Sequence, residues 1–291
     1  MLIWLAWLAV AGLACFVWGL FEAKMYRVVE YKLPVLPRGS APVSVLQVSD
    51  LHLRPANRKL IAFLQRLSKR TFDVVLATGD LLGDPRSVES CSEALNGLQA
   101  RIARYYVFGS SDYYAPVFKN YLDYFLKKKR PRTKKNRTEP FRQALIVAGW
   151  IELTNHTLQT SFNGTKTQVT GLDDPHLDRD DRSLLIRDPD ALFAMCVVHD
   201  PAPYREAQVA GFDLVVSGHT HGGQVRLPFI GAVVTNSTIP TELARGPHKI
   251  DGTWLFVTPG LGTGKFAPFR FLNRPEASVL NLVERPHQDS R

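Results

Sequence analysis

The sequence is poor in cysteine, with only three among 291 residues. Cys15 lies in an apolar run, and Cys91 and Cys196 have neither the number nor the spacing of a disulfide framework. This scarcity argues against a small disulfide-stapled secreted protein. A single disulfide between two of the three cysteines remains an alternative. With 45% hydrophobic residues, the chain is long enough to bury one large core.

Charged residues are missing from Leu2 to Phe21, a stretch with three tryptophans and many Leu, Ala and Val residues. About 20 apolar residues suffice to cross a bilayer as a helix. No basic residue precedes this run, whereas a cleavable signal peptide normally begins with one. We therefore expect residues 1–22 to form a retained single-pass transmembrane anchor, followed by a linker over residues 23–41.

Basic residues follow the apolar run, and none comes before it. By the positive-inside rule, this asymmetry predicts that the catalytic body lies in the cytoplasm. The low cysteine content agrees with that compartment. The residues concerned are Lys24, Arg27, Lys32 and Arg38.

Acidic residues are absent from residues 127–137, KKKRPRTKKNR, which hold eight of the basic side chains. Because the net charge of the chain is +9, the remainder is nearly neutral. The preceding FKNYLDYFLKK has apolar residues at helical spacing, which predicts an amphipathic helix. Together with the basic run, it predicts a basic insertion over residues 117–140. An amphipathic helix leading into this run favours contact with anionic lipid headgroups, with a solvated loop as the alternative. No recognised nucleic-acid module accompanies the charge, which argues against nucleic acid as a partner.

The body alternates apolar runs with helical patterns, which predicts an α/β domain over residues 42–291. Helical periodicity covers residues 58–69 and 88–102, whereas the second half contains short strands and an Asn163-Gly164 hairpin turn. A pair of mixed sheets is therefore expected. Five runs share one form, a buried-looking strand that ends in a polar cluster: VSVLQVSD (43–50), DVVLATGD (73–80), YYVFGSSD (105–112), FAMCVVHD (193–200) and DLVVSGHTH (213–221).

The polar ends of these runs are expected to meet, because the carboxyl ends of strands in an open α/β sheet gather at one ligand-binding edge. Asp50 and His52, like His219 and His221, are two residues apart and point to the same side of an extended chain. Mixed carboxylates and imidazoles favour Mn, Fe or Zn. Two such ions about 3.5 to 4 Å apart, bridged by Asp80, would activate water for attack on phosphorus as a metal-bound hydroxide.

The motifs SDLH, TGD and GHTHGGQ, in this order and with an isolated His199 between them, resemble the calcineurin-like metallophosphoesterases. Three features are most similar to the membrane-associated YkuE/YaeI-like branch: the residues of the GHTHGGQ motif, the GLDDP motif and the apolar N-terminus. The resemblance spans about residues 43–282. It implies a four-layer α/β/β/α sandwich of two mixed sheets with a dimetal site at the strand ends.

The resemblance also implies the roles of individual residues. Asp50, His52, Asp80 and His221 would hold the first ion. Asp80, His199 and His219 would hold the second, and these three side chains would be the catalytic ones.

The chain departs from the family pattern G-N-H-[DE], because Gly109, Ser110, Ser111 and Asp112 stand there. Ser110 offers the second ion only a weak hydroxyl ligand. Ser111 cannot serve as a general acid, a function typically worth about 10²- to 10⁴-fold in rate. A substrate that needs no proton donor, or a substitute such as His176, would resolve the loss. Asp112 is expected to orient its loop, and Asp84 likewise to be structural.

Two other catalytic patterns are absent. PGLGTGK at 259–265 lacks the residues of a Walker phosphate loop and is expected to be a turn that borders the pocket. No serine lies in G-x-S-x-G, and metal binding would occupy the imidazoles that a catalytic triad needs.

The sequence therefore predicts a membrane-anchored, metal-dependent phosphoesterase that hydrolyses a phosphomonoester or phosphodiester, with a membrane-borne substrate favoured. The alternative, suggested by Ser110 and Ser111, is a membrane-surface binding protein that keeps the fold but has lost turnover.

Overall fold

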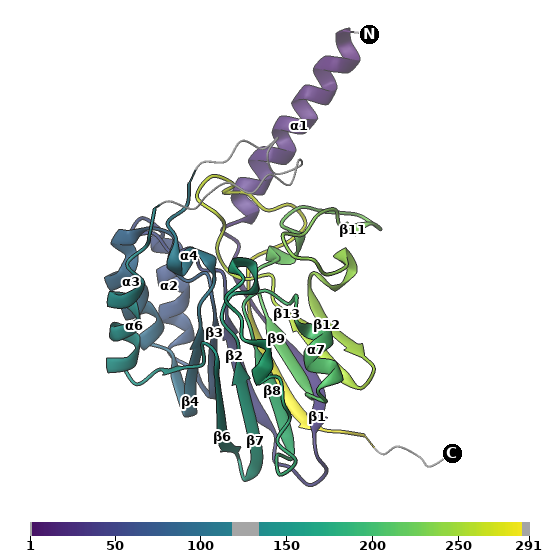
Figure 1. Cartoon of the computed structure of the whole chain (residues 1–291). Coiled ribbons are helices and arrows are strands. Elements are labelled where there is room, and N and C mark those ends of the chain that lie inside the picture. The colour runs from purple at the N-terminus through teal and green to yellow at the C-terminus, as the bar shows by residue number, and fades with distance from the viewer. Residues whose placement is uncertain (1, 118–133, 287–291) are drawn as a thin grey trace.

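The computed structural model describes residues 2–117 and 134–286, and Figure 1 shows two packed sheets with a long helix projecting from one end. The helices are α1 (Leu2–Glu22), α2 (Arg58–Leu67), α3 (Val88–Asn96), α4 (Ser110–Tyr113), α6 (Thr138–Val147) and α7 (Tyr204–Val209). The strands of the first half are β1 (Arg27–Leu36), β2 (Val43–Val48), β3 (Thr71–Thr78), β4 (Gln99–Val107), β5 (Ile151–Glu152), β6 (His156–Phe162) and β7 (Thr165–Gly171). Those of the second half are β8 (Phe193–Val197), β9 (Leu214–Ser217), β10 (Arg226–Leu227), β11 (Gly231–Ala232), β12 (Gly246–Ile250), β13 (Thr253–Val257) and β14 (Glu276–Glu284).

The first sheet has the order β1-β14-β2-β3-β4-β5. Its pairs are parallel except for β14 with β2, which run antiparallel. Helices α2, α3 and α6 cover its outer face. Helix α2 shows why, since Leu60, Phe63, Leu64 and Leu67 recur every three or four residues and are all buried.

The second sheet has the order β12-β13-β9-β8-β7-β6, with antiparallel pairs at its two edges and parallel pairs between them. Asn163 and Gly164 form the turn between β6 and β7, as the sequence predicts. Helix α7 and the segment around Leu185 pack on the outer face of this sheet.

The two sheets enclose a shared core. Val45, Leu76 and Val107 of the first sheet pack in one cluster with Met195 and Val216 of the second. The predicted α/β/β/α sandwich of two mixed sheets is confirmed, with a small helical layer on the second sheet. Cys91 and Cys196 are buried and free in different clusters, so the disulfide left open by the sequence does not form.

Two predicted boundaries were wrong. Residues 27–36, assigned to a linker, form the edge strand β1 and pair with β14 from Arg27 to Leu36. The helix expected over residues 88–102 ends at Asn96, and β4 begins at Gln99. Gly97 follows the helix, and only hydrogen bonding to β3 distinguishes the next apolar residues as a strand.

Helix α1 is, among the described residues, the one helix long and apolar enough to cross a membrane, over Ile3–Glu22. Most of its side chains are exposed, but its last turns rest on the body. The carbonyl of Gly19 accepts from the Arg270 N–H at 3.0 Å, and the Phe16 and Phe269 rings lie 5.8 Å apart. Most of the predicted basic insertion, including its helix, lies outside the described residues.

Candidate metal centre

Six of the predicted ligands meet at the carboxyl ends of four strands. Asp50 and His52 follow β2, Asp80 follows β3 and His199 follows β8. His219 and His221 follow β9. All are buried except His52, which is mostly buried, so the two sheets bring these side chains together beneath the surface.

The backbone at these positions is unusual. Five of the six residues have φ in the left-handed region, which non-glycine residues rarely adopt. Such conformations cluster at functional sites, where the surrounding structure stabilises them against local strain. The values are 51° at Asp50, 38° at His52, 51° at Asp80, 65° at His219 and 50° at His221.

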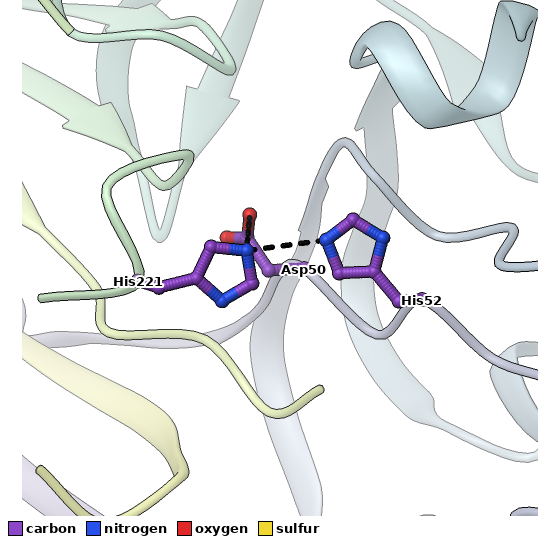
Figure 2. Close-up of side chains that lie close together, drawn as sticks. All are labelled: Asp50, His52 and His221. Atoms are coloured by element: carbon purple, nitrogen blue, oxygen red, sulfur yellow. Dashed lines mark hydrogen bonds and ion pairs between the residues drawn. The ribbon is translucent and has the colours of Figure 1, made fainter. Parts of the chain in front are cut away.

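One group of ligands consists of Asp50, His52 and His221, whose donor atoms lie within 4.8 Å of one another. Figure 2 shows the two imidazoles facing each other beside the carboxylate. The Nε2 atoms of His52 and His221 are 3.1 Å apart, and the His221 Nε2 lies 3.5 Å from the Asp50 Oδ1. This convergence of donor atoms is suited to one divalent ion.

Asp80 lies between two imidazoles. Its Oδ2 is 3.4 Å from the His52 Nε2, and its Oδ1 is 3.5 Å from the His199 Nε2. The His199 Nε2 in turn lies 3.2 Å from the His219 Nδ1. The Asp80 carboxylate is therefore placed to serve ligand groups on both of its sides.

A further group surrounds the outer nitrogen of His219. Its Nε2 lies 3.5 Å from the Asp200 Oδ2, and its ring centroid is 4.9 Å from that of the exposed His176. His176, Asp200 and His219 form another set of donors within 4.8 Å. His176, raised by the sequence only as a substitute acid, thus lies at the edge of the centre.

The charge state of the centre suits a metal. Burial raises the pKa of Asp50, but the neighbouring His221 and His199 outweigh it and lower that pKa overall. Burial lowers the pKa of His52, and that of His221 to about 3. The fully buried Asp50 Oδ1 has no hydrogen-bond partner. Burial of a charged oxygen without a partner is costly, so this atom is suited to bind a cation.

Hydrogen bonds on the far ring nitrogens orient three of the imidazoles. The His199 Nδ1–H donates to the Thr78 carbonyl at 2.8 Å, which directs Nε2 into the centre. The His52 Nδ1 pairs with the Ser111 hydroxyl at 3.2 Å. The Arg270 guanidinium lies 3.3 Å from the His221 Nδ1. Such partners fix the ring orientation of metal ligands.

The Gly109–Asp112 turn supports the centre from the first sheet. Asp112 accepts from the backbone N–H groups of Leu81, Leu82 and Gly109, which confirms its expected orienting role. Burial, reinforced by Asp80, raises the Asp112 pKa to about 7. Ser110 is buried in the first turn of α4.

Ser111 provides a test of this support. Its backbone N–H donates to the Asp80 Oδ1 at 2.7 Å, and its hydroxyl holds His52. Ser111→Ala removes only the hydroxyl, so we expect metal affinity to fall about 10-fold or more, as for other supporting partners. Isothermal titration with Mn²⁺ measures the change. Ser68→Ala is the matched variant, because the Ser68 hydroxyl donates to the Gln65 carbonyl at the end of α2, and a wild-type affinity in Ser111→Ala would contradict this role.

Sequence reasoning missed Arg270. The guanidinium is fully buried and donates to the carbonyls of Pro259, Gly260 and Gly262 at 2.8, 3.1 and 2.7 Å. These carbonyls belong to the glycine-rich turn, which borders the centre as predicted: a Cβ on Gly260 would lie 2.6 Å from the Asp50 Cβ.

Asp200 and Asn273 were missed as well. Asp200 directly follows His199 in the quoted VHD run, so its position was a usable signal. Asn273, whose Nδ2 donates to the His221 carbonyl, gave no local signal. Asp84 caps the turn at Pro85–Ser87 and pairs with Arg86, as its structural interpretation requires.

The comparison with protein families agrees with this geometry. The calcineurin-like phosphoesterase model matches residues 43–223, which carry all six ligands. The chain belongs to the calcineurin-like phosphoesterase family. It is therefore a metallophosphoesterase, and the predicted enzyme class is confirmed.

Relatives in this family cover most of the chain. The metallophosphoesterase YkuE of Bacillus subtilis is 27% identical, over 90% of this chain and 87% of its own length. The phosphodiesterase YaeI of Escherichia coli is 23% identical, over 90% of each chain. A transmembrane protein with a metallophosphoesterase domain from Danio rerio is 27% identical, over 92% of this chain and 59% of its own length.

Proposed function

We propose that this metallophosphoesterase is anchored in a membrane by α1 and hydrolyses a phosphodiester or phosphomonoester with two divalent ions. The observation that carries the proposal is the convergence of six carboxylate and imidazole side chains at neighbouring strand ends, where the buried Asp50 Oδ1 has no hydrogen-bond partner. Carboxylates and imidazoles in this proportion suit Mn, Fe or Zn. When bound, such ions activate water at neutral pH and stabilise the charge that develops on phosphate oxygens.

The proposed ligand assignment is the one implied by the family resemblance, and the short distances from Asp80 to His52 and His199 support it. Asp50, His52, Asp80 and His221 hold the first ion. Asp80, His199 and His219 hold the second, with Ser110 as a weak additional ligand. Asp80, His199 and His219 would be the catalytic side chains; the Asp80 Oδ1 lies 3.5 Å from the His199 Nε2, which lies 3.2 Å from the His219 Nδ1.

Ser111 does not replace the proton donor of the family, because its hydroxyl pairs with His52. A phosphodiester with a readily displaced leaving group needs no such donor. The exposed His176 ring, beside His219, is the imidazole placed to supply a proton where one is needed.

The anchor and its orientation belong to the same proposal. Helix α1 is apolar and exposed over a length that spans a bilayer. The basic residues that follow it support a cytoplasmic body by the positive-inside rule. Residues 127–137, of which 127–133 lie outside the described residues, would meet anionic lipid headgroups near the anchor.

Metal content combined with hydrolysis tests the function. We expect the purified full chain to carry about two ions, by mass spectrometry of the metals, and to hydrolyse bis(p-nitrophenyl) phosphate. Removal of the ions with a chelator should abolish turnover, and Mn²⁺ should restore it. One ion or none, without turnover in any metal, would instead support the membrane-surface binding protein.

A further inference from the structure

An exposed apolar hairpin follows the last histidine of the centre. Residues 225–234, here called the apolar hairpin, contain the short antiparallel strands β10 and β11. Phe229 at the tip is fully exposed, and Ile230 is 70% exposed. Leu227, Val233 and Val234 are exposed as well. Contiguous exposed apolar side chains of this kind mark a surface that binds a partner or a membrane.

The apolar hairpin and α1 are held by the same segment. Val225 bridges to Phe271, and the Arg226 N–H donates to the Phe271 carbonyl at 2.9 Å. One residue earlier, the Arg270 N–H donates to the Gly19 carbonyl of α1. Figure 1 shows β11 at the end of the body from which α1 projects.

These attachments set the level of the hairpin relative to a bilayer. A helix rises about 1.5 Å per residue, so Gly19 lies only about 4.5 Å from Glu22, the end of the candidate span. The segment that holds the hairpin therefore meets α1 where the helix leaves the hydrocarbon. Aromatic and aliphatic side chains at that level sit at the boundary of headgroups and acyl chains.

The apolar hairpin is also joined to the metal centre. It begins after the turn His221–Gly223, and the Arg226 Nη1 donates to the Gly222 carbonyl at 3.0 Å. On its far side, the Asn236 carbonyl lies 3.4 Å from the His219 Nε2. The position of the hairpin thus fixes the position of the centre relative to the membrane.

We propose that the apolar hairpin inserts into the bilayer interface beside α1 and presents the metal centre to the phosphate ester of a membrane lipid. The insertion rests on the proposed anchor α1, and the presentation of a lipid ester rests on the proposed hydrolysis. The lipid bilayer is the occupant, because the segment that holds the hairpin also contacts the candidate span.

Fluorescence tests the insertion. In a Cys15→Ala background of the full chain, Phe229→Cys is labelled with the dye NBD and reconstituted in phosphatidylcholine bilayers containing phosphatidylglycerol. Val209→Cys, exposed on α7, is the matched control. We expect the dye at position 229 to shift to the blue and to be quenched by doxyl lipids, but not the dye at 209. Equal, water-like emission at both positions would overturn the insertion.

Paired substrates test the lipid specificity. Phosphatidyl-p-nitrophenol and bis(p-nitrophenyl) phosphate release the same group, but only the first is held in a bilayer. For Phe229→Ser/Ile230→Ser we expect roughly tenfold slower hydrolysis of the lipid and unchanged hydrolysis of the soluble ester. Val147→Ser/Val209→Ser is the control, and alkaline extraction checks that α1 still anchors each variant.

The outcomes separate the two proposals. An equal effect on both substrates, or none on the lipid, would overturn the lipid specificity. If the wild-type chain hydrolyses neither ester in any metal, the proposed function fails, while the NBD measurement still decides whether the hairpin inserts.

Discussion

Asp80→Asn is expected to lower the rate of phosphodiester hydrolysis by at least about a thousandfold, because bound metal lowers the activation barrier by several kcal/mol. The asparagine keeps an Oδ1 that can accept from the Ser111 N–H, so the fold should survive. It places an NH₂ group where Oδ2 faces His52, and this group cannot bind a metal. Steady-state rates and metal content at saturating Mn²⁺ measure the effect.

Asp84→Asn is the matched control for Asp80. It lies four residues further along the chain, where its carboxylate caps the turn at Pro85–Ser87 and pairs with Arg86. Its removal should leave turnover close to that of the wild type. Full activity in Asp80→Asn would contradict the proposed bridging role of that carboxylate.

Arg270→Met is expected to lower the free energy of unfolding by about 3 kcal/mol or more, which is the second large effect. The change leaves the buried carbonyls of Pro259 and Gly262 without a donor, whereas Gly260 keeps the Glu276 N–H, and each orphaned acceptor costs about 1 to 3 kcal/mol. Burial lowers the Arg270 pKa to about 10, so the guanidinium is charged at neutral pH. Urea unfolding with and without Mn²⁺ measures the loss, and metal affinity should fall with it.

Two further variants serve as comparisons for Arg270→Met. Arg66→Met, on the exposed surface of α2, should change stability by no more than about 0.5 kcal/mol. Arg270→Lys keeps the charge but has one nitrogen in place of two, so it cannot contact both the glycine-rich turn and the Asn273 carbonyl, and an intermediate loss is expected. Wild-type stability in Arg270→Met would show that the glycine-rich turn does not depend on this side chain.

The strand ends of the centre could be predicted because their signal is local. Each ligand follows a buried strand, and both the apolar run and the polar residue after it lie within about ten residues of sequence. The geometry of parallel strands then brings these ends to one edge. The sequence could therefore indicate the six ligands without knowing the order of the strands.

Strand β1 and Arg270 could not be predicted, because their structure depends on residues that are far away in the sequence. Strand β1 carries Glu30, Lys32 and Pro34, which look like a solvated linker, and it becomes a strand only through β14. Arg270 resembles a surface residue in its local sequence. Its burial arises from contacts with the glycine-rich turn, His221 and Gly19 together.

The pairing of β1 with β14 has a consequence for biosynthesis. Strand β14 lies between β1 and β2, so β1, the strand that follows α1, has no β14 partner until the last strand leaves the ribosome. A nascent chain already inserted by α1 would therefore hold an open sheet edge close to the bilayer throughout translation. Such edges are prone to mispairing, so ribosome-bound chains that stop before residue 276 should need chaperone protection.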